Sequence, residues 1–150
     1  MMSTDQMVAW LRQAMGTAQW DAETAARETE PEWSDGGPYG EGVHTQRHGS
    51  PVAVGPWGYM DDAVRTHIAR HDPTAVLRRI TKDRELLDDI LAEKHHISDD
   101  PWYTCPAATR ERDGGTYAET EGGGQCSCGR DERAQRRIRT LAEGYGWTEK

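Results

Sequence analysis

The sequence contains no phenylalanine, and only 35% of its 150 residues are hydrophobic. It also has no long apolar run: Met7 to Leu11 is cut off by Arg12 and Gln13, far short of the roughly 18 residues of a membrane span. These absences predict a cytoplasmic protein without a membrane segment or a signal peptide. The core has to be small and has to depend on Leu, Ile, Val, Met and six Trp residues.

Cysteine is also scarce, and its number is odd. The three cysteines are Cys105, Cys126 and Cys128. In a reducing compartment such a set points to metal ligands or unpaired thiols, and away from a disulfide framework.

Positive charge is the minority sign, with 18 basic against 26 acidic residues and a formal net charge of −8. This balance argues against general affinity for nucleic acid or acidic membranes, which depends on neutralising phosphates. We expect a protein partner with a basic surface. A Gly-rich phosphate loop, a serine nucleophile motif and a Rossmann fingerprint are missing as well, so the sequence indicates no reaction.

Two helices in series organise the chain over residues 61–97. The first spans residues 61–70, and Asp72 and Pro73 restart the second, because Asp caps helices and Pro fits the first helical position. The second helix is predicted to continue to His96. Its apolar residues recur at spacings of three, four and seven, which is typical of a core-facing stripe. They are Val76, Leu77, Ile80, Leu87, Ile90 and Leu91.

A further helix is predicted within residues 1–30, capped by Ser3 or Thr4. Gly16 costs roughly 1 kcal/mol relative to Ala and allows a break. The apolar stripe consists of Val8, Leu11, Met15, Ala18, Ala22 and Ala25. A stripe this narrow is typical of a coiled-coil seam, which allows a homodimer.

Residues 31–57 are rich in Gly and Pro turn signals. Three short segments with strand character, 32–34, 43–46 and 52–54, predict a small antiparallel meander with a hairpin turn at residues 48–51. Two tryptophans, Trp33 and Trp57, are expected to cover its buried face, since an indole combines a large apolar area with an N–H that needs a partner.

His67 and His71 lie four residues apart, and Asp72 follows them. On a helix this spacing puts both rings on one face, where they could hold a metal ion. The glutamate of the His-Glu-x-x-His signature is missing between them. A metal-dependent hydrolase that uses these three residues is an alternative function, and surface or capping histidines are the other interpretation.

Several short runs, spread over nearly the whole chain, form a recognisable pattern. They are Gly55-Pro56-Trp57-Gly58, Thr66-His67-Ile68-Ala69-Arg70-His71-Asp72-Pro73, Ala75-Val76-Leu77-Arg78, Cys126-x-Cys128-Gly129-Arg130-Asp131, Arg136-Arg137-Ile138-Arg139 and Leu141-Ala142. Together they resemble the domain-of-unknown-function family 6221, an uncharacterised group of streptomycetes, related actinobacteria and their phages. The resemblance implies a cytoplasmic accessory protein with no established activity or catalytic residue. The chain departs from the pattern at Gly144-Tyr145-Gly146-Trp147, where a Pro-Tyr and His-Pro segment is usual.

The three cysteines fall in a loop-like segment that follows the long helix. Zn²⁺ prefers four N or S ligands in a tetrahedron, so Cys105, Cys126 and Cys128 with one histidine would form a structural Cys₃His site. His96 lies nearer the loop and is the preferred ligand, with His95 as the alternative, since adjacent helical residues point about 100° apart. The other interpretation is three reduced thiols in a loop without a metal.

The last segment is predicted to be a helix. Its arginines are Arg130, Arg133, Arg136, Arg137 and Arg139. A metal-binding loop followed by an Arg-rich helix makes nucleic-acid binding a further alternative. The acidic remainder of the chain opposes it, and the arginines can pair with the acidic first helix.

These features predict one α+β domain, with helices packed around a long central helix, a small antiparallel β-meander and a zinc-tied C-terminal loop. Its parts are an N-terminal helix (1–30), a small sheet (31–57), central helices (61–97), a Cys-bearing loop (98–130) and a C-terminal helix (131–147). The expected function is that of a small, non-enzymatic binding or regulatory accessory protein with a structural zinc site.

Overall fold

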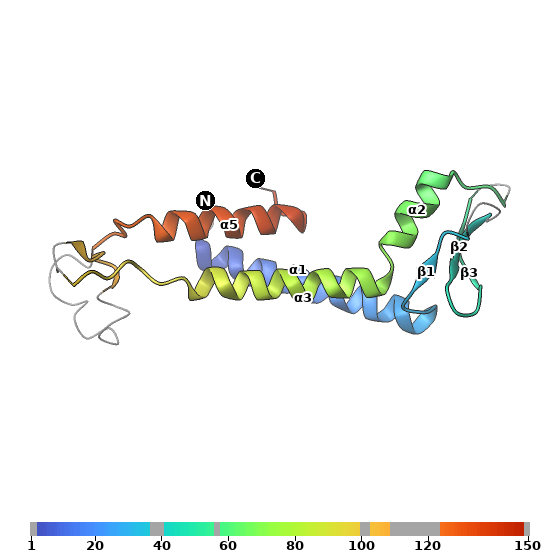
Figure 1. Ribbon diagram of the computed structural model, residues 1–150, viewed down its shortest axis with the longest axis horizontal. Helices are drawn as coiled ribbons and strands as arrows, with labels where there is room; N and C mark the ends of the chain where they lie inside the picture. Colours follow the sequence, from blue (N-terminus) through green and yellow to red (C-terminus); the bar gives the residue numbers. More distant parts are fainter. Residues whose placement is uncertain (1–2, 37–40, 56–57, 100–102, 109–123, 149–150) are drawn as a thin grey trace. The chain divides into compact units, whose positions relative to one another are not determined.

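The computed structural model describes residues 3–36, 41–55, 58–99, 103–108 and 124–148. Its contacts divide the chain into two compact units. The sheet unit is Arg12–Arg84, and the cysteine unit is Met1–Leu11 together with Glu85–Lys150. Within the described residues the structure has four α-helices and three β-strands (Figure 1).

Helix α1 spans Thr4–Glu28 without a break. Ser3 and Gln6 cap its start reciprocally: the Gln6 N–H donates to Ser3 Oγ (3.2 Å), and the Ser3 N–H donates to Gln6 Oε1 (2.8 Å). Gly16 lies inside the helix, and a Cβ added there would meet nothing within 4 Å. The predicted cap at Ser3 is therefore confirmed, and the break considered at Gly16 does not occur.

The sheet unit holds an antiparallel meander in the order β1-β2-β3. Its strands are β1 at Trp33–Ser34, β2 at Gly42–Thr45 and β3 at Pro51–Val54. In the turn after β2, Gly49 has a φ of 66°, and its N–H donates to the Thr45 carbonyl (3.0 Å). A positive φ suits glycine, which is why the turn signal at residues 48–51 located this hairpin.

Trp33 is half-buried, and its indole N–H donates to the carbonyl of Glu30 (2.9 Å). The expectation that its N–H needs a partner is therefore met. The second predicted tryptophan, Trp57, lies outside the described residues.

Helices α2 (Asp62–Arg70) and α3 (Pro73–Ala92) begin where the sequence predicts. Asp61 Oδ1 accepts a backbone N–H of the first turn of α2 (2.8 Å), and Asp72 Oδ1 does the same for α3 (2.7 Å). Both starts are set by local cap chemistry.

The end of α3 differs from the prediction. The helix stops at Ala92 and does not reach His96. The carbonyl of His96 accepts the Cys105 N–H (2.9 Å), and the Arg130 side chain binds carbonyls at the helix end. Both partners come from later in the chain, so the local pattern could not indicate this end.

Helix α5 spans Arg130–Gly144. Beyond it, Gly146 has a φ of 90°, and the Trp147 N–H donates back to the Ala142 carbonyl (3.0 Å). This ending leaves Trp147 only 8% exposed, with the Arg139 guanidinium carbon 6.0 Å from its ring centre. The tail thus belongs to the buried part of the cysteine unit.

The predicted apolar stripes supply about half of the core. Buried side chains of the cysteine unit are Met7, Val8, Leu11, Leu87, Ile90, Ala134, Ile138, Ala142 and Trp147, and those of the sheet unit include Met15, Ala22, Val43 and Ile80. With its helices and antiparallel sheet, the structure confirms the α+β class. None of the helices that the structure describes combines the length and the apolar composition of a membrane span.

Candidate metal centre

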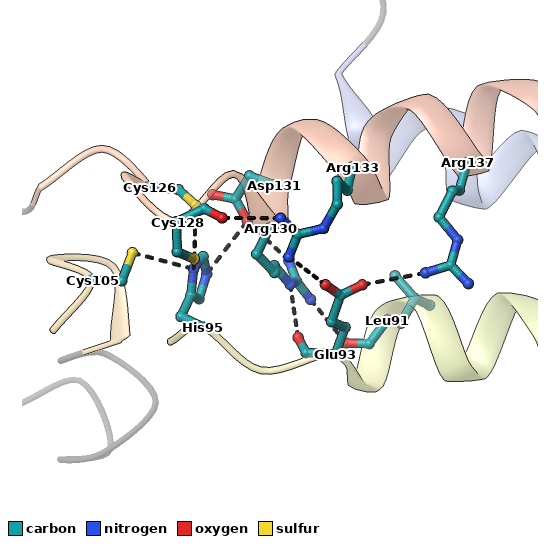
Figure 2. A network of polar contacts seen from close by, with 10 residues as sticks. All are labelled: Leu91, Glu93, His95, Cys105, Cys126, Cys128, Arg130, Asp131, Arg133 and Arg137. Carbon is teal, nitrogen blue, oxygen red and sulfur yellow. Dashed lines mark hydrogen bonds and ion pairs between the residues drawn. The ribbon is translucent and has the colours of Figure 1, made fainter. Parts of the chain in front are cut away.

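Four side chains of the cysteine unit converge on one point (Figure 2). They are His95, Cys105, Cys126 and Cys128, and one ligand atom from each lies within 4.8 Å of all the others. The Sγ atoms of Cys105 and Cys128 are each 3.6 Å from His95 Nδ1. The Sγ atoms of Cys126 and Cys128 are also 3.6 Å apart.

These distances match the edges of a tetrahedral zinc site. Zn–S bonds of about 2.3 Å and Zn–N bonds of about 2.0–2.1 Å place neighbouring ligand atoms roughly 3.6–3.8 Å apart. Three thiols and an imidazole are also the donors that structural zinc sites use. The residues therefore fit a zinc ion, and four protein donors would leave no position for a water molecule.

His95, and not the preferred His96, faces the cysteines. His95 is 8% exposed and Cys105 is 1% exposed, whereas the His96 side chain lies in solvent. The preference for His96 assumed that α3 continues through both residues. Because the chain leaves the helix at Ala92, that premise fails, and His95 is the residue turned inward.

Backbone N–H groups point at two of the sulfurs. Burial opposes a charge on Cys105, but N–H groups that include those of Cys128 and Ser127 outweigh it and lower the pKa of Cys105 to about 5. The N–H of His96 is the largest cause of the lowered pKa of Cys128. Both sulfurs are prepared as thiolates, which is the form that binds metal.

The Asp131 carboxylate lies next to the ring nitrogen of His95 that faces away from the sulfurs. Its Oδ1 lies 3.4 Å from His95 Nε2, while Nδ1 faces the sulfurs. Burial lowers the pKa of His95, but the hydrogen bonds with Cys128 and Cys105 and the charge of Asp131 raise it overall. A carboxylate on the second nitrogen is the usual support of a metal-binding histidine, because it fixes the tautomer and the ring orientation.

Tight turns follow Cys105 and Cys128. The Ala108 N–H donates to the Cys105 carbonyl (2.8 Å). Gly129 has a φ of 73°, and a Cβ added to it would lie 3.2 Å from a guanidinium nitrogen of Arg133. The glycine lets the chain turn at once from the ligand Cys128 into α5.

Arginines of α5 join the cluster to the end of α3 (Figure 2). Arg130 donates to the carbonyls of Glu93 (2.7 Å) and Leu91 (3.0 Å), which extends the C-terminal cap of α3. Arg133 and Arg137, one turn apart, donate to the two oxygens of the Glu93 carboxylate at 2.7 and 3.3 Å. Arg133 is the largest cause of the lowered pKa of Glu93. The acidic partner of Arg133 and Arg137 is therefore Glu93, whereas the sequence had indicated the first helix.

Of the five arginines proposed for nucleic-acid binding, Arg130, Arg133 and Arg137 thus bind groups of the protein itself, and Arg139 lies against Trp147. Glu93 was not predicted from the sequence, because no motif distinguishes it. Asp131 was not predicted either, although its spacing of three residues from Cys128 could have indicated its return to the cluster.

The residues proposed for a hydrolase do not form a comparable group. The rings of His67 and His71 lie side by side with centroids 4.4 Å apart, and both side chains are exposed. Asp72 Oδ1 accepts the Ala75 N–H as the cap of α3, and Asp72 Oδ2 accepts the Trp33 N–H of β1 (3.4 Å). Among the described residues these three do not meet as a metal-ligand cluster.

Residues 4–146 match a family described as a family of unknown function (DUF6221). The chain belongs to this family. No curated protein and no solved structure matches it. All four ligand residues and Asp131 lie inside the span matched by DUF6221, so the candidate metal centre is part of the family domain and not an appendage to it.

Proposed function

We propose that this DUF6221 protein is a non-enzymatic binding module whose cysteine unit is folded by one structural zinc ion. The observation that carries the proposal is the set of four donors within 4.8 Å of one another, with three of the pairs at the 3.6 Å spacing of a tetrahedral site. Catalytic zinc sites keep one position open for water or substrate, and this donor set leaves none. The role of the centre is therefore to hold the fold.

The surroundings of the cluster support this role. Cys105 lies in the segment 103–108, where Ala108 is the buried apolar residue beside it. A segment with so little apolar area gains little from burial, and metal binding can supply the missing free energy of folding. The donors also come from stretches that lie far apart in sequence, His95 and Cys105 on one side and Cys126 and Cys128 on the other, so one ion would join them.

We propose that the partner is a protein that the module meets in the cytoplasm of an actinobacterium or during infection by a phage. The acidic balance of the chain supports a basic partner surface. The sheet unit also exposes four large apolar side chains, Trp20, Val54, Tyr59 and Val64, as interaction surfaces commonly do. Pull-down from an actinobacterial lysate tests the partner, and light scattering after size exclusion tests the homodimer.

A metal count tests the zinc. Protein purified without added metal should contain one zinc per chain, measured by inductively coupled plasma mass spectrometry. His95→Ala should lose the zinc because it removes the only nitrogen donor of the cluster. His96→Ala is the matched control and should retain it, because that side chain lies in solvent.

Two results would overturn the proposal. One is a metal-free protein whose melting temperature does not change with zinc or with a chelator. The other is zinc that His96→Ala removes and His95→Ala does not.

A further inference from the structure

We propose that Cys126 and Cys128 form a peroxide-sensitive pair that closes to a disulfide and releases the metal. This inference rests on the proposed zinc site and adds its regulation. The molecule that reacts with the pair is a two-electron oxidant of the peroxide class. The pair would make the fold of the cysteine unit responsive to oxidation.

Exposure separates the four ligands into two classes. Cys105 and His95 are buried, at 1% and 8% exposure, whereas Cys126 and Cys128 are half-buried. A peroxide molecule must touch the sulfur that it oxidises, so it reaches Cys126 or Cys128 before Cys105. The two reachable sulfurs are also neighbours, 3.6 Å apart.

Chain geometry favours the same pair. A single residue, Ser127, separates the two cysteines, so closing the disulfide needs little movement elsewhere. The flanking Gly129 already has a positive φ of 73° and can absorb a change in the turn. Cys105, by contrast, comes from a separate segment, and its buried sulfur accepts backbone N–H groups.

The reaction balances with one peroxide molecule. The first thiolate attacks a peroxide oxygen, the O–O bond breaks, and with one proton a sulfenic acid and water result. The second thiolate attacks the sulfenic sulfur and, with a second proton, expels water as the S–S bond forms. Each sulfur loses one electron, and the peroxide gains two.

Loss of two thiolates leaves only His95 and Cys105 as donors, too few for a tetrahedral site. A disulfide across one intervening residue is strained, and strained disulfides are reduced readily. The change is therefore reversible by a thiol or phosphine reductant with added zinc.

Trypsin cleavage separates Cys105 from Cys126 and Cys128, so the disulfide that forms can be assigned by mass. Cleavage after Lys94, Arg110, Arg112 and Arg130 places Cys105 in peptide 95–110, and both other cysteines in peptide 113–130. Zinc-loaded full-length protein is treated with hydrogen peroxide. Released zinc is followed with a chromogenic chelator, and thiols are then blocked before digestion. The expected result is one zinc lost per disulfide, with peptide 113–130 lighter by two hydrogen atoms and unalkylated.

Cys126→His is the matched control. It keeps four donors, as a Cys₂His₂ site, but removes one sulfur of the pair. It should bind zinc and release it at least tenfold more slowly under the same peroxide. A phosphine reductant with added zinc should restore one zinc per chain in the wild type.

The outcomes separate the two proposals. A purified protein that never binds zinc overturns the zinc site itself. Zinc that stays bound while peroxide is consumed overturns the inference and leaves the site standing. So does a cross-link between peptides 95–110 and 113–130, or equal zinc release from Cys126→His.

Discussion

At the scale of single residues, Asp131 decides how well His95 is presented to the cysteines. Its carboxylate lies 3.4 Å from His95 Nε2. Replacing such a support typically costs 10–100-fold in metal affinity. We expect Asp131→Asn to weaken zinc binding by about that factor in a competition titration with a chromogenic chelator. Glu132→Gln, the exposed neighbour, should bind zinc like the wild type, and equal affinity of all three proteins would contradict the role of Asp131.

Two glycines should respond in opposite directions to the same substitution. Gly16→Ala should raise the free energy of unfolding by roughly 0.5–1 kcal/mol, because the position is helical and open. Gly129→Ala should lower it by about 1 kcal/mol or more, because φ is 73° and the new methyl group would crowd Arg133. Urea denaturation of the two zinc-loaded variants measures both. A stabilised Gly129→Ala would show that the turn after Cys128 differs from the one described.

The residue types at the cluster could be predicted from sequence, because three cysteines and a nearby pair of histidines are the donor types that metal sites use. The choice between His95 and His96 as the ligand could not be predicted from the sequence. It depends on where α3 ends, and that end is stabilised by Arg130, more than thirty residues later. Asp131 and Glu93 were missed for the same reason, since their roles follow from contacts across the chain.

At the scale of helices, Arg130 joins α3 to α5 through two carbonyl contacts. Arg130→Lys keeps the charge, but an ammonium group cannot reproduce the planar fork that reaches both carbonyls. We expect a loss of about 1–2 kcal/mol in unfolding free energy, measured by urea denaturation. Arg136→Lys, on the exposed side of α5, is the control and should change stability by less than about 0.5 kcal/mol. Equal effects would mean that the cap on α3 is energetically unimportant.

Element starts were predicted better than element ends. Ser3, Asp61 and Asp72 cap the helix that follows each of them, so a few residues suffice to locate a start. The meander was likewise indicated by local turn chemistry around Gly49. The four helices that the structure describes, of 25, 9, 20 and 15 residues, hold close to half of the chain, in agreement with the high helix content that the periodicity indicated.

At the scale of the whole molecule, acid should destabilise the metal-free protein in a defined window. The folded chain holds the pKa of Cys105 near 5, whereas an unfolded thiol titrates near about 8.5. This thiolate therefore contributes stability above about pH 8.5, and the contribution is lost as the pH falls toward 5. The raised pKa of His95 acts in the opposite sense only above about pH 6.5.

Between about pH 6.5 and 5 the thiolate effect is thus unopposed by His95. Unfolding free energy of the metal-free protein should fall there by up to about 1.4 kcal/mol per pH unit for each proton taken up. Urea denaturation at a series of pH values measures the slope. Cys105→Ser should flatten it, and an unchanged slope in that variant would assign the dependence to other groups.

Chelation should affect the two units differently. All four ligands belong to the cysteine unit, so zinc removal should reduce amide protection at residues 103–108 and 124–130. Protection of the strands β1, β2 and β3 should change little. Hydrogen exchange with and without chelator measures this. Loss of protection to the same extent in the strands would contradict a local role for the centre.

The two units also differ in whether they are continuous in sequence, and this difference sets the order in which they are completed during synthesis. The sheet unit is one continuous segment, Arg12–Arg84, and is complete in sequence before any metal ligand has been translated. The cysteine unit combines Met1–Leu11 with residues that follow Glu85, and its last ligand is Cys128. Domains generally fold as units while the ribosome is still adding residues. The nascent sheet unit can therefore fold early, whereas the first turns of α1 belong to a unit that is complete only after Cys128 and α5 have been translated.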